Sequence, residues 1–243
     1  MFIHKYANSD GIKVHYMDNA FEDSFPTPLV YVPGALNFAE QTIDLLSTFN
    51  PRRIVTMSLR GRGKSDAPQT GYALENHVQD IAAVIEESKV QNYCLMAYSM
   101  GVPYAIKYAA KEENIKGLIL CDYPATYPAI PETWSDRILT RGFIPEGRKH
   151  VVTGMQRDSK QTELSLELSL LDIPVLIIKG GEEGSLLKEK EVDKYKRFLK
   201  DVTICEIIES GHELWDPDKQ KFIEIISIFL RKLDNSDEKE GLN

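Results

Sequence analysis

The sequence predicts an α/β fold built on a mostly parallel sheet of eight strands. Two observations support this prediction: strand-like and helix-like segments alternate along the chain, and from the third onward the strands are short, continuous apolar runs. Such runs are typical of a parallel sheet that helices cover on both faces. The 243 residues can bury one good core, so we expect a single domain with one insertion.

The expected strands are rich in β-branched and aromatic residues and span residues 2–6, 12–17, 29–32, 53–57, 93–96, 117–121, 175–178 and 203–208. The first two flank Asn8-Ser9-Asp10-Gly11 and are expected to form an antiparallel hairpin. The expected helices carry apolar residues three and four apart and span residues 39–48, 74–88, 100–110, 188–199 and 218–233. Their alternation with the strands predicts βα units wrapped around the sheet.

The alternation stops between residues 123 and 172, a proline-containing segment without an obvious core strand. An unstructured loop of this length is rare in a compact domain, so we expect a small, folded, helical cap over the sheet. The expected core is then residues 1–122 and 173–233. The tail, residues 234–243, is polar and charged and is expected to be disordered.

Composition limits the possible partners. A formal net charge of −8 leaves no basic face for a nucleic acid or an anionic membrane surface, so the expected partner is a small molecule. The oligomeric state stays open. Cys94, Cys121 and Cys205 each lie in an apolar run, where they are expected to be buried thiols in a reducing compartment. The amino terminus lacks the pattern of a secretion signal, so we expect a cytoplasmic protein.

One stretch, Ala97-Tyr98-Ser99-Met100-Gly101, sets a serine between small residues where an expected strand meets a helix. A nucleophilic serine at such a turn has a strained backbone, and the tight packing requires small residues two positions before and after it. The following helix directs its free N–H groups toward the space where an oxyanion would form. A helix N-cap serine shows the same local pattern, so the catalytic interpretation depends on partners elsewhere.

These residues, followed by an acid and then His212, resemble the α/β-hydrolase family over nearly the whole chain outside the cap. Val32-Pro33-Gly34-Ala35 stands at the family's turn after the third strand, with proline in place of the usual histidine. The resemblance implies an oxyanion hole made by the backbone N–H groups of Met100 and Ala35, with Leu36 as the alternative to Ala35.

A second turn, Ser58-Leu59-Arg60-Gly61-Arg62-Gly63-Lys64-Ser65, resembles the family's D-x-R-G-x-G-x-S motif, with serine in place of the aspartate, and we interpret it as structural. It does not match a phosphate-binding loop, because position 58 is serine rather than glycine. The dinucleotide fingerprint fails as well, since Asp66 stands where its third glycine belongs. We therefore expect no cofactor.

The resemblance places the catalytic histidine at His212, in Ser210-Gly211-His212. The acid is assigned to Glu183, because the turn that begins at Gly180 resembles the family's G-x-x-D turn after the seventh strand. Glu182 and Asp122, which follows the sixth expected strand, remain alternatives. The other histidines are interpreted as surface or edge residues, and the sequence spacings predict no metal site: they are His4, His15, His77 and His150.

If these residues meet, Ser99 attacks an acyl carbon, His212 transfers the proton and Glu183 orients the imidazole. We expect a serine hydrolase acting on a small carboxylic ester or lactone. The alternatives are a carbon–carbon bond hydrolase or lyase, or a thioesterase, acting on a small oxo-acid, and a non-catalytic ligand-binding protein. Expected substrate-binding residues are Leu36, Tyr98, Tyr127 and Trp134. Basic cap residues could attract a carboxylate or form a solvated face: Arg137, Arg141, Arg148, Lys149 and Arg157.

Overall fold

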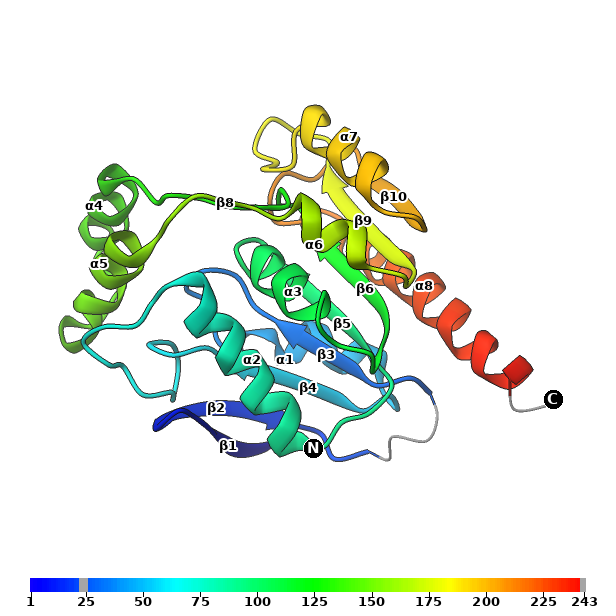
Figure 1. Ribbon diagram of the computed structural model, residues 1–243, viewed down its shortest axis with the longest axis horizontal. Helices are drawn as coiled ribbons and strands as arrows, with labels where there is room; N and C mark the ends of the chain where they lie inside the picture. Colours follow the sequence, from blue (N-terminus) through cyan, green and yellow to red (C-terminus); the bar gives the residue numbers. More distant parts are fainter. Residues whose placement is uncertain (22–25, 241–243) are drawn as a thin grey trace.

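The computed structural model describes residues 1–21 and 26–240, and an eight-stranded sheet lies at its centre (Figure 1). The strand order is β1-β2-β4-β3-β5-β6-β9-β10. Pairing is antiparallel between β1, β2 and β4 and parallel between all later neighbours. The predicted α/β class with a mostly parallel sheet is confirmed. The strands are β1 (Ile3–Ser9), β2 (Ile12–Asp18), β3 (Leu29–Val32), β4 (Ile54–Ser58), β5 (Tyr93–Tyr98), β6 (Ile115–Cys121), β9 (Val175–Gly180) and β10 (Val202–Ile207).

Helices cover both faces of the sheet, and β5 shows how this produces an unbroken apolar strand. Its residues Tyr93, Leu95 and Ala97 belong to one core, and the residues between them belong to the core on the opposite face. The first core includes residues of α2 (Leu74–Ser88), α3 (Gly101–Ala109) and α7 (Glu189–Phe198); the second includes residues of α1 (Ile43–Leu46) and α8 (Lys219–Glu240). The helix expected over residues 39–48 is instead three short pieces: η1 (Ala39–Thr42), α1 and η2 (Ser47–Phe49).

Residues 123–172, here called the cap segment, leave the core after β6 and return before β9. A two-stranded stem of β7 (Thr126–Tyr127) and β8 (Thr162–Glu163) joins the two passages. Beyond the stem, α4 (Glu132–Thr140) and α5 (Lys149–Asp158) lie apart from the sheet (Figure 1). Val151 and Met155 of α5 are nevertheless buried in the first core, which docks the helix onto the sheet domain. The cap segment also contains η3 (Glu146–Arg148) and α6 (Ser165–Leu170).

The sequence predicts disorder for the tail, residues 234–243. Residues 234–240 continue α8, and residues 241–243 lie outside the described residues. The helix continues because Asp234 is buried in a bidentate ion pair with Arg52, at 2.8 and 3.0 Å, and also accepts the N–H of Thr27 at 2.9 Å. A long-range, charge-assisted anchor of this kind cannot be read from local composition.

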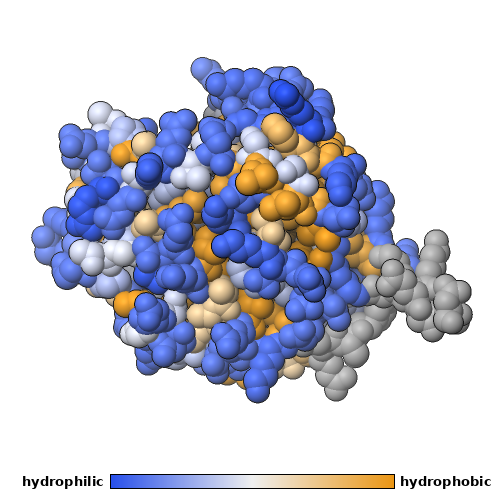
Figure 2. All heavy atoms as spheres, viewed as in Figure 1, coloured by the Kyte–Doolittle hydropathy of each residue, from blue (hydrophilic) through white to orange (hydrophobic). Residues whose placement is uncertain are grey.

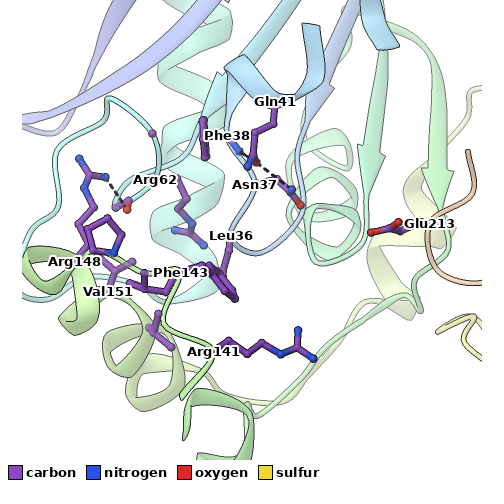
Figure 3. Close-up of a pocket in the computed structure, with 15 residues that line it drawn as sticks. Leu36, Asn37, Phe38, Gln41, Arg62, Arg141, Phe143, Arg148, Val151 and Glu213 are labelled. Carbon is purple, nitrogen blue, oxygen red and sulfur yellow. Dashed lines mark hydrogen bonds between the residues drawn. The ribbon is translucent and has the colours of Figure 1, made fainter. Parts of the chain in front are cut away.

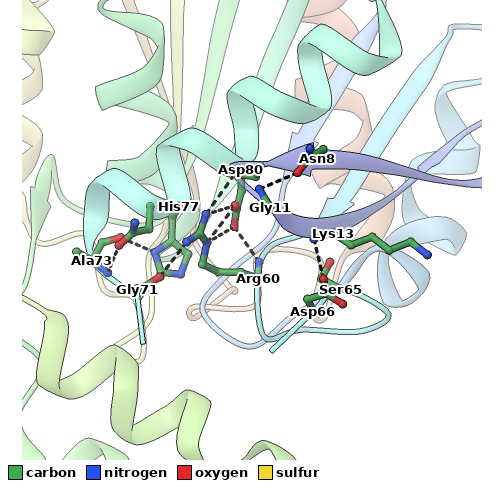
Figure 4. A network of polar contacts seen from close by, with 12 residues as sticks. Asn8, Gly11, Lys13, Arg60, Ser65, Asp66, Gly71, Ala73, His77 and Asp80 are labelled. Carbon is green, nitrogen blue, oxygen red and sulfur yellow. Dashed lines mark hydrogen bonds and ion pairs between the residues drawn. The ribbon is translucent and has the colours of Figure 1, made fainter. Parts of the chain in front are cut away.

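The turn after β4 is held by a buried polar network (Figure 4). The guanidinium of Arg60 pairs with Asp80 of α2 at 2.6 Å and donates to the carbonyl of Gly71 at 3.1 Å. Ser58, which replaces the family's aspartate, accepts the backbone N–H of Ala39 at 3.0 Å. The turn therefore ties β4 to α2 and η1, as a structural element would.

Polar side chains cover most of the face shown in Figure 2, with apolar side chains visible between them. Within the described part of the chain, no helix has both the length and the apolar content needed to cross a membrane.

Candidate active site

Ser99 occupies a sharp turn between β5 and α3. Its φ is +54°, in the left-handed region that few non-glycine residues adopt. The turn continues into the helix because Val102 donates its N–H to the carbonyl of Ser99 at 2.8 Å. A Cβ atom on Gly101 would lie only 2.6 Å from the carbonyl oxygen of Pro33, so glycine is required at that position. The local geometry is that of a nucleophile elbow.

His212 lies in the loop after β10 and contacts Ser99 directly. The Ser99 hydroxyl donates to Nε2 of His212 at 2.9 Å, and Nδ1 of His212 donates to Oδ2 of Asp122 at 2.8 Å. The second contact sets the tautomer that leaves Nε2 free to accept. Tyr98 stacks on the imidazole, with ring centroids 4.9 Å apart, and its hydroxyl donates to the carbonyl of His212 at 3.2 Å. Ser99, His212 and Asp122 thus form one hydrogen-bonded chain.

The assignment of Glu183 as the acid is wrong in this structure. Both ring nitrogens of His212 are already engaged, by Ser99 and Asp122, whereas Glu183 is exposed. The reason is the packing of the loop after β9. A Cβ atom on Gly180 or Gly181 would collide with the backbone of residues 208–211, so this loop lies directly against the histidine loop. The carboxylate that contacts His212 is instead that of Asp122, which directly follows β6.

The loop after β9, which was expected to supply the acid, instead supplies hydrogen-bond donors to Asp122. Asp122 is fully buried and accepts hydrogen bonds from the hydroxyl of Ser185 and the N–H groups of Gly180 and Leu186, the last at 2.9 Å. Burial by itself raises the pKa of Asp122. Hydrogen bonds from His212, Ser185 and the backbone outweigh this effect and hold the pKa below its usual value. Asp122 is therefore a carboxylate facing the imidazole.

The expected oxyanion-hole residues lie on two sides of Ser99. Met100 is the N-cap residue of α3, and Ala35 lies in a turn closed by a hydrogen bond from the N–H of Asn37 to the carbonyl of Gly34, at 3.3 Å. A Cβ atom on Gly34 would lie 3.1 Å from Cβ of Ser99, so this turn packs against the serine. The N–H groups of Met100 and Ala35, or of Leu36, remain the predicted donors.

The side chain of Arg62 forms a hydrogen bond with this turn, and the sequence did not predict this contact. Its Nε donates to the carbonyl of Ala35 at 2.8 Å, and because a peptide group is planar, the same bond orients the N–H of Leu36. Nη1 donates to Nε2 of His77 at 2.8 Å, and Nη2 contacts the sulfur of Met155 in the cap segment at 3.1 Å. The sequence shows Arg62 only as a variable position of the glycine-rich turn.

A cavity of about 760 Å³ lies between the core loops and the cap segment (Figure 3). Two lining residues, Leu36 and Glu213, are sequence neighbours of Ala35 and His212. Of the expected substrate-binding residues, only Leu36 lines this cavity. Tyr98 lies under His212 and lines a smaller cavity of about 210 Å³, Tyr127 is buried, and Trp134 packs against the core.

Two other histidine interpretations need correction, because His15 and His77 are fully buried. His4, His15 and Glu40 bring ligand-type atoms within 4.8 Å of one another. The group already has its own contacts: Nδ1 of His4 lies 2.8 Å from Nε2 of His15, and the ammonium of Lys64 lies 3.3 Å from both His4 and Glu40. A metal ion there would compete with that ammonium.

Comparison with known proteins agrees with this geometry. A family model described as alpha/beta hydrolase fold matches residues 27–141. The AB hydrolase superfamily protein YisY of Bacillus subtilis is 25% identical over 219 residues, which cover 73% of this chain and 81% of that protein. N-formylmaleamate deformylase of Pseudomonas putida is 22% identical over 250 residues, covering 86% and 90%. An esterase from Exiguobacterium antarcticum has a TM-score of 0.77 at 20% identity, covering 94% of this chain and 100% of that one. The chain therefore has the α/β-hydrolase fold.

Proposed function

We propose that this protein is a serine hydrolase that cleaves a small carboxylic ester or lactone through an acyl-enzyme. The observation that carries the proposal is the hydrogen-bonded chain from Ser99 through His212 to Asp122, with Ser99 at a φ of +54° on the strand-to-helix turn. Helix packing and capping do not require all three side chains in this order, whereas nucleophilic catalysis does.

The proposed reaction follows from these contacts. Nε2 of His212 accepts the Ser99 proton as Oγ attacks the acyl carbon, and the Asp122 carboxylate stabilises the resulting imidazolium. The N–H groups of Met100 and Ala35 bind the oxyanion, at roughly 3 kcal/mol of transition-state stabilisation for each donor. His212 then returns the proton to the leaving oxygen. Water hydrolyses the acyl-enzyme with His212 as the base, which regenerates the Ser99 hydroxyl.

Hydrolysis of a small amide is the second candidate. The relative N-formylmaleamate deformylase aligns with 86% of this chain, and its name indicates cleavage of a formyl group from nitrogen. The same three side chains serve an amide when His212 protonates the leaving nitrogen. Matched ester and amide substrates with the same acyl group would separate the two candidates by their kcat/KM values.

The first test is labelling of the purified protein with a fluorophosphonate probe, followed by intact mass and peptide mapping. We expect one adduct on Ser99, which is absent in Ser99→Ala and absent or strongly slowed in His212→Ala. Circular dichroism of each variant checks that it is folded. A folded wild-type protein that takes up no probe would contradict the proposal and favour a non-catalytic binding role.

A further inference from the structure

The cavity of about 760 Å³ is lined by both apolar and charged residues. Its apolar residues come from the loop after β3 and from the cap segment: Leu36, Phe38, Phe143, Ile144, Val151 and Val152. Three arginines also line it, Arg62, Arg141 and Arg148, against one acidic residue, Glu213. These lining residues sum to a formal charge of +2 in a chain whose net charge is −8. This contrast favours an anionic ligand.

The contacts of the basic cap residues distinguish their roles. Lys149 pairs with Glu146 at 2.6 Å, and Arg157 pairs with Asp158 at 2.7 Å. Arg148 donates to the carbonyls of Gly61 and Ser65, so its donors hold the cap segment on the core. These three cations are therefore engaged within the protein.

Arg141 differs from those residues. It follows the last residue of α4 and lines the cavity, and within the described residues it has no ion pair with a carboxylate. Figure 3 shows its side chain extended from the cap toward the side of the view where Glu213 lies, with no dashed contact at its guanidinium. Arg137 lies one helical turn earlier, is exposed and does not line the cavity. Arg141 therefore lines the cavity and, in the part of the chain that the structure describes, has no partner carboxylate.

We propose that the substrate carries a carboxylate, and that Arg141 binds it while the apolar wall holds the carbon chain between that carboxylate and the scissile bond. A planar guanidinium offers two parallel N–H donors that match the two oxygens of a carboxylate. Because Leu36 and Glu213 adjoin Ala35 and His212, a short chain that fills the cavity places its other end near Ser99. This inference rests on the proposed function for the chemistry, but the binding of the carboxylate can be measured without it.

The kinetic test compares monomethyl esters of four- to six-carbon dicarboxylic acids with neutral methyl esters of the same chain length. The readout is the ratio of the two kcat/KM values. We expect Arg141→Ala to lower this ratio about 10- to 100-fold, the worth of one charge-assisted pair. Arg141→Lys is expected to recover part of it. Arg137→Ala removes the same charge one helical turn earlier, within α4, and is the matched control, with an unchanged ratio.

A binding measurement separates this inference from the hydrolase proposal. Calorimetric titration of Ser99→Ala with the half-esters, and with the neutral esters as controls, requires no turnover. Tighter binding of the half-esters that Arg141→Ala weakens at least tenfold and Arg137→Ala does not would support the carboxylate site, even in a protein that hydrolyses neither ester. Equal binding of charged and neutral esters, or an equal effect of both arginine substitutions, would overturn it. If the half-esters bind in this way but the wild-type protein hydrolyses no ester, only the hydrolase proposal would be contradicted.

Discussion

Asp122 and Glu183 both follow a strand of the sheet, but only one of them is shielded from water. Asp122 is fully buried and receives its hydrogen bonds from His212, Ser185 and backbone N–H groups, whereas Glu183 is exposed. A carboxylate that orients a histidine must remain ionised at a fixed position, and fixed donors in a buried site provide this.

Mutation can distinguish whether Asp122 or Glu183 acts as the acid. Asp122→Asn preserves the shape of the residue but removes its charge and favours the wrong tautomer of His212, so we expect kcat to fall by about 10³- to 10⁴-fold. Glu183→Gln is the matched control and should change kcat less than twofold. Steady-state kinetics and the rate of fluorophosphonate labelling provide the measurement. A large effect of Glu183→Gln with little effect of Asp122→Asn would reverse the assignment.

Arg62 is a buried cation whose hydrogen-bond partners are mostly neutral. Besides the carbonyl of Ala35 it binds the carbonyl of Arg60 at 2.6 Å and His77, and desolvation is the main reason that its pKa is lowered. Burying such a charge costs stability unless it is paired. Because the carbonyl of Ala35 shares a peptide plane with the N–H of Leu36, we infer that Arg62 is a positioning residue for Leu36, the alternative oxyanion donor.

Arg62→Met tests that positioning role. We expect kcat to fall about 10- to 100-fold with little change in KM, because a misdirected donor is lost in the transition state more than in the ground state. The melting temperature should change by only a few degrees, since removal of a buried charge offsets the lost hydrogen bonds. Kinetics and thermal unfolding of the same samples give both values. A loss of kcat that merely follows a large loss of stability would indicate a structural role alone.

At the scale of elements, the elbow works because β5, α3 and the loop after β3 approach one another closely. Gly101 allows this approach, since a Cβ atom there would lie 2.6 Å from the carbonyl oxygen of Pro33 and 2.8 Å from that of Val32. Both obstacles are backbone atoms, which cannot rotate away as a flexible side chain could.

Gly101→Ala should therefore destabilise the fold by about 1 to 3 kcal/mol and displace the turn that carries Ala35. Gly147→Ala is the control, because nothing lies within 4 Å of its Cβ position, and it should change the free energy of unfolding by less than about 0.5 kcal/mol. Urea unfolding measures both variants. Equal stability of Gly101→Ala and the wild type would show that the loop after β3 can move without cost.

At the scale of the whole molecule, buried titratable groups determine how stability depends on pH. Burial lowers the pKa of His15 to about 4 and that of His77 well below its usual value. Below about pH 6.5 the unfolded chain then binds more protons than the folded one, and stability falls as the pH falls. The pKa of Asp122 and of Asp234 is lowered although burial alone raises it, so their stabilising contribution is present above about pH 4 and is lost through their folded-state pKa values.

We therefore expect the free energy of unfolding to decrease in two stages, first between about pH 6.5 and 4 and then more steeply below pH 4. Each buried histidine contributes up to about 1.4 kcal/mol per pH unit in the first stage. Urea midpoints at pH 7.5, 6, 5, 4 and 3 measure the profile, and His15→Gln should flatten the first stage. A midpoint that stays constant from pH 7.5 to 4 would contradict this account.

The sheet, its flanking helices and the nucleophile turn could be predicted because each follows from short-range patterns. Strands buried on both faces read as continuous apolar runs, and the small residues around Ser99 reflect contacts within one turn. The hydrogen bond between His212 and Ser99 agrees with the order of motifs along the chain. The polar composition of residues 234–243 predicts disorder, and it gives no sign of the ion pair between Asp234 and Arg52.

By itself, the sequence determined the fold class, the turn that carries Ser99, and the choice of Ser99 and His212 as the candidate nucleophile and base. These depend on residue type and on periodicity over a few positions. The tertiary structure decided which acid faces His212, which arginine holds the turn of Ala35, and which cap cation stays unpaired beside the cavity. Each of these depends on burial and on contacts between residues far apart in the chain. Charge and hydrogen-bonding capacity are visible in a sequence, but the partners that satisfy them are chosen only when the elements pack.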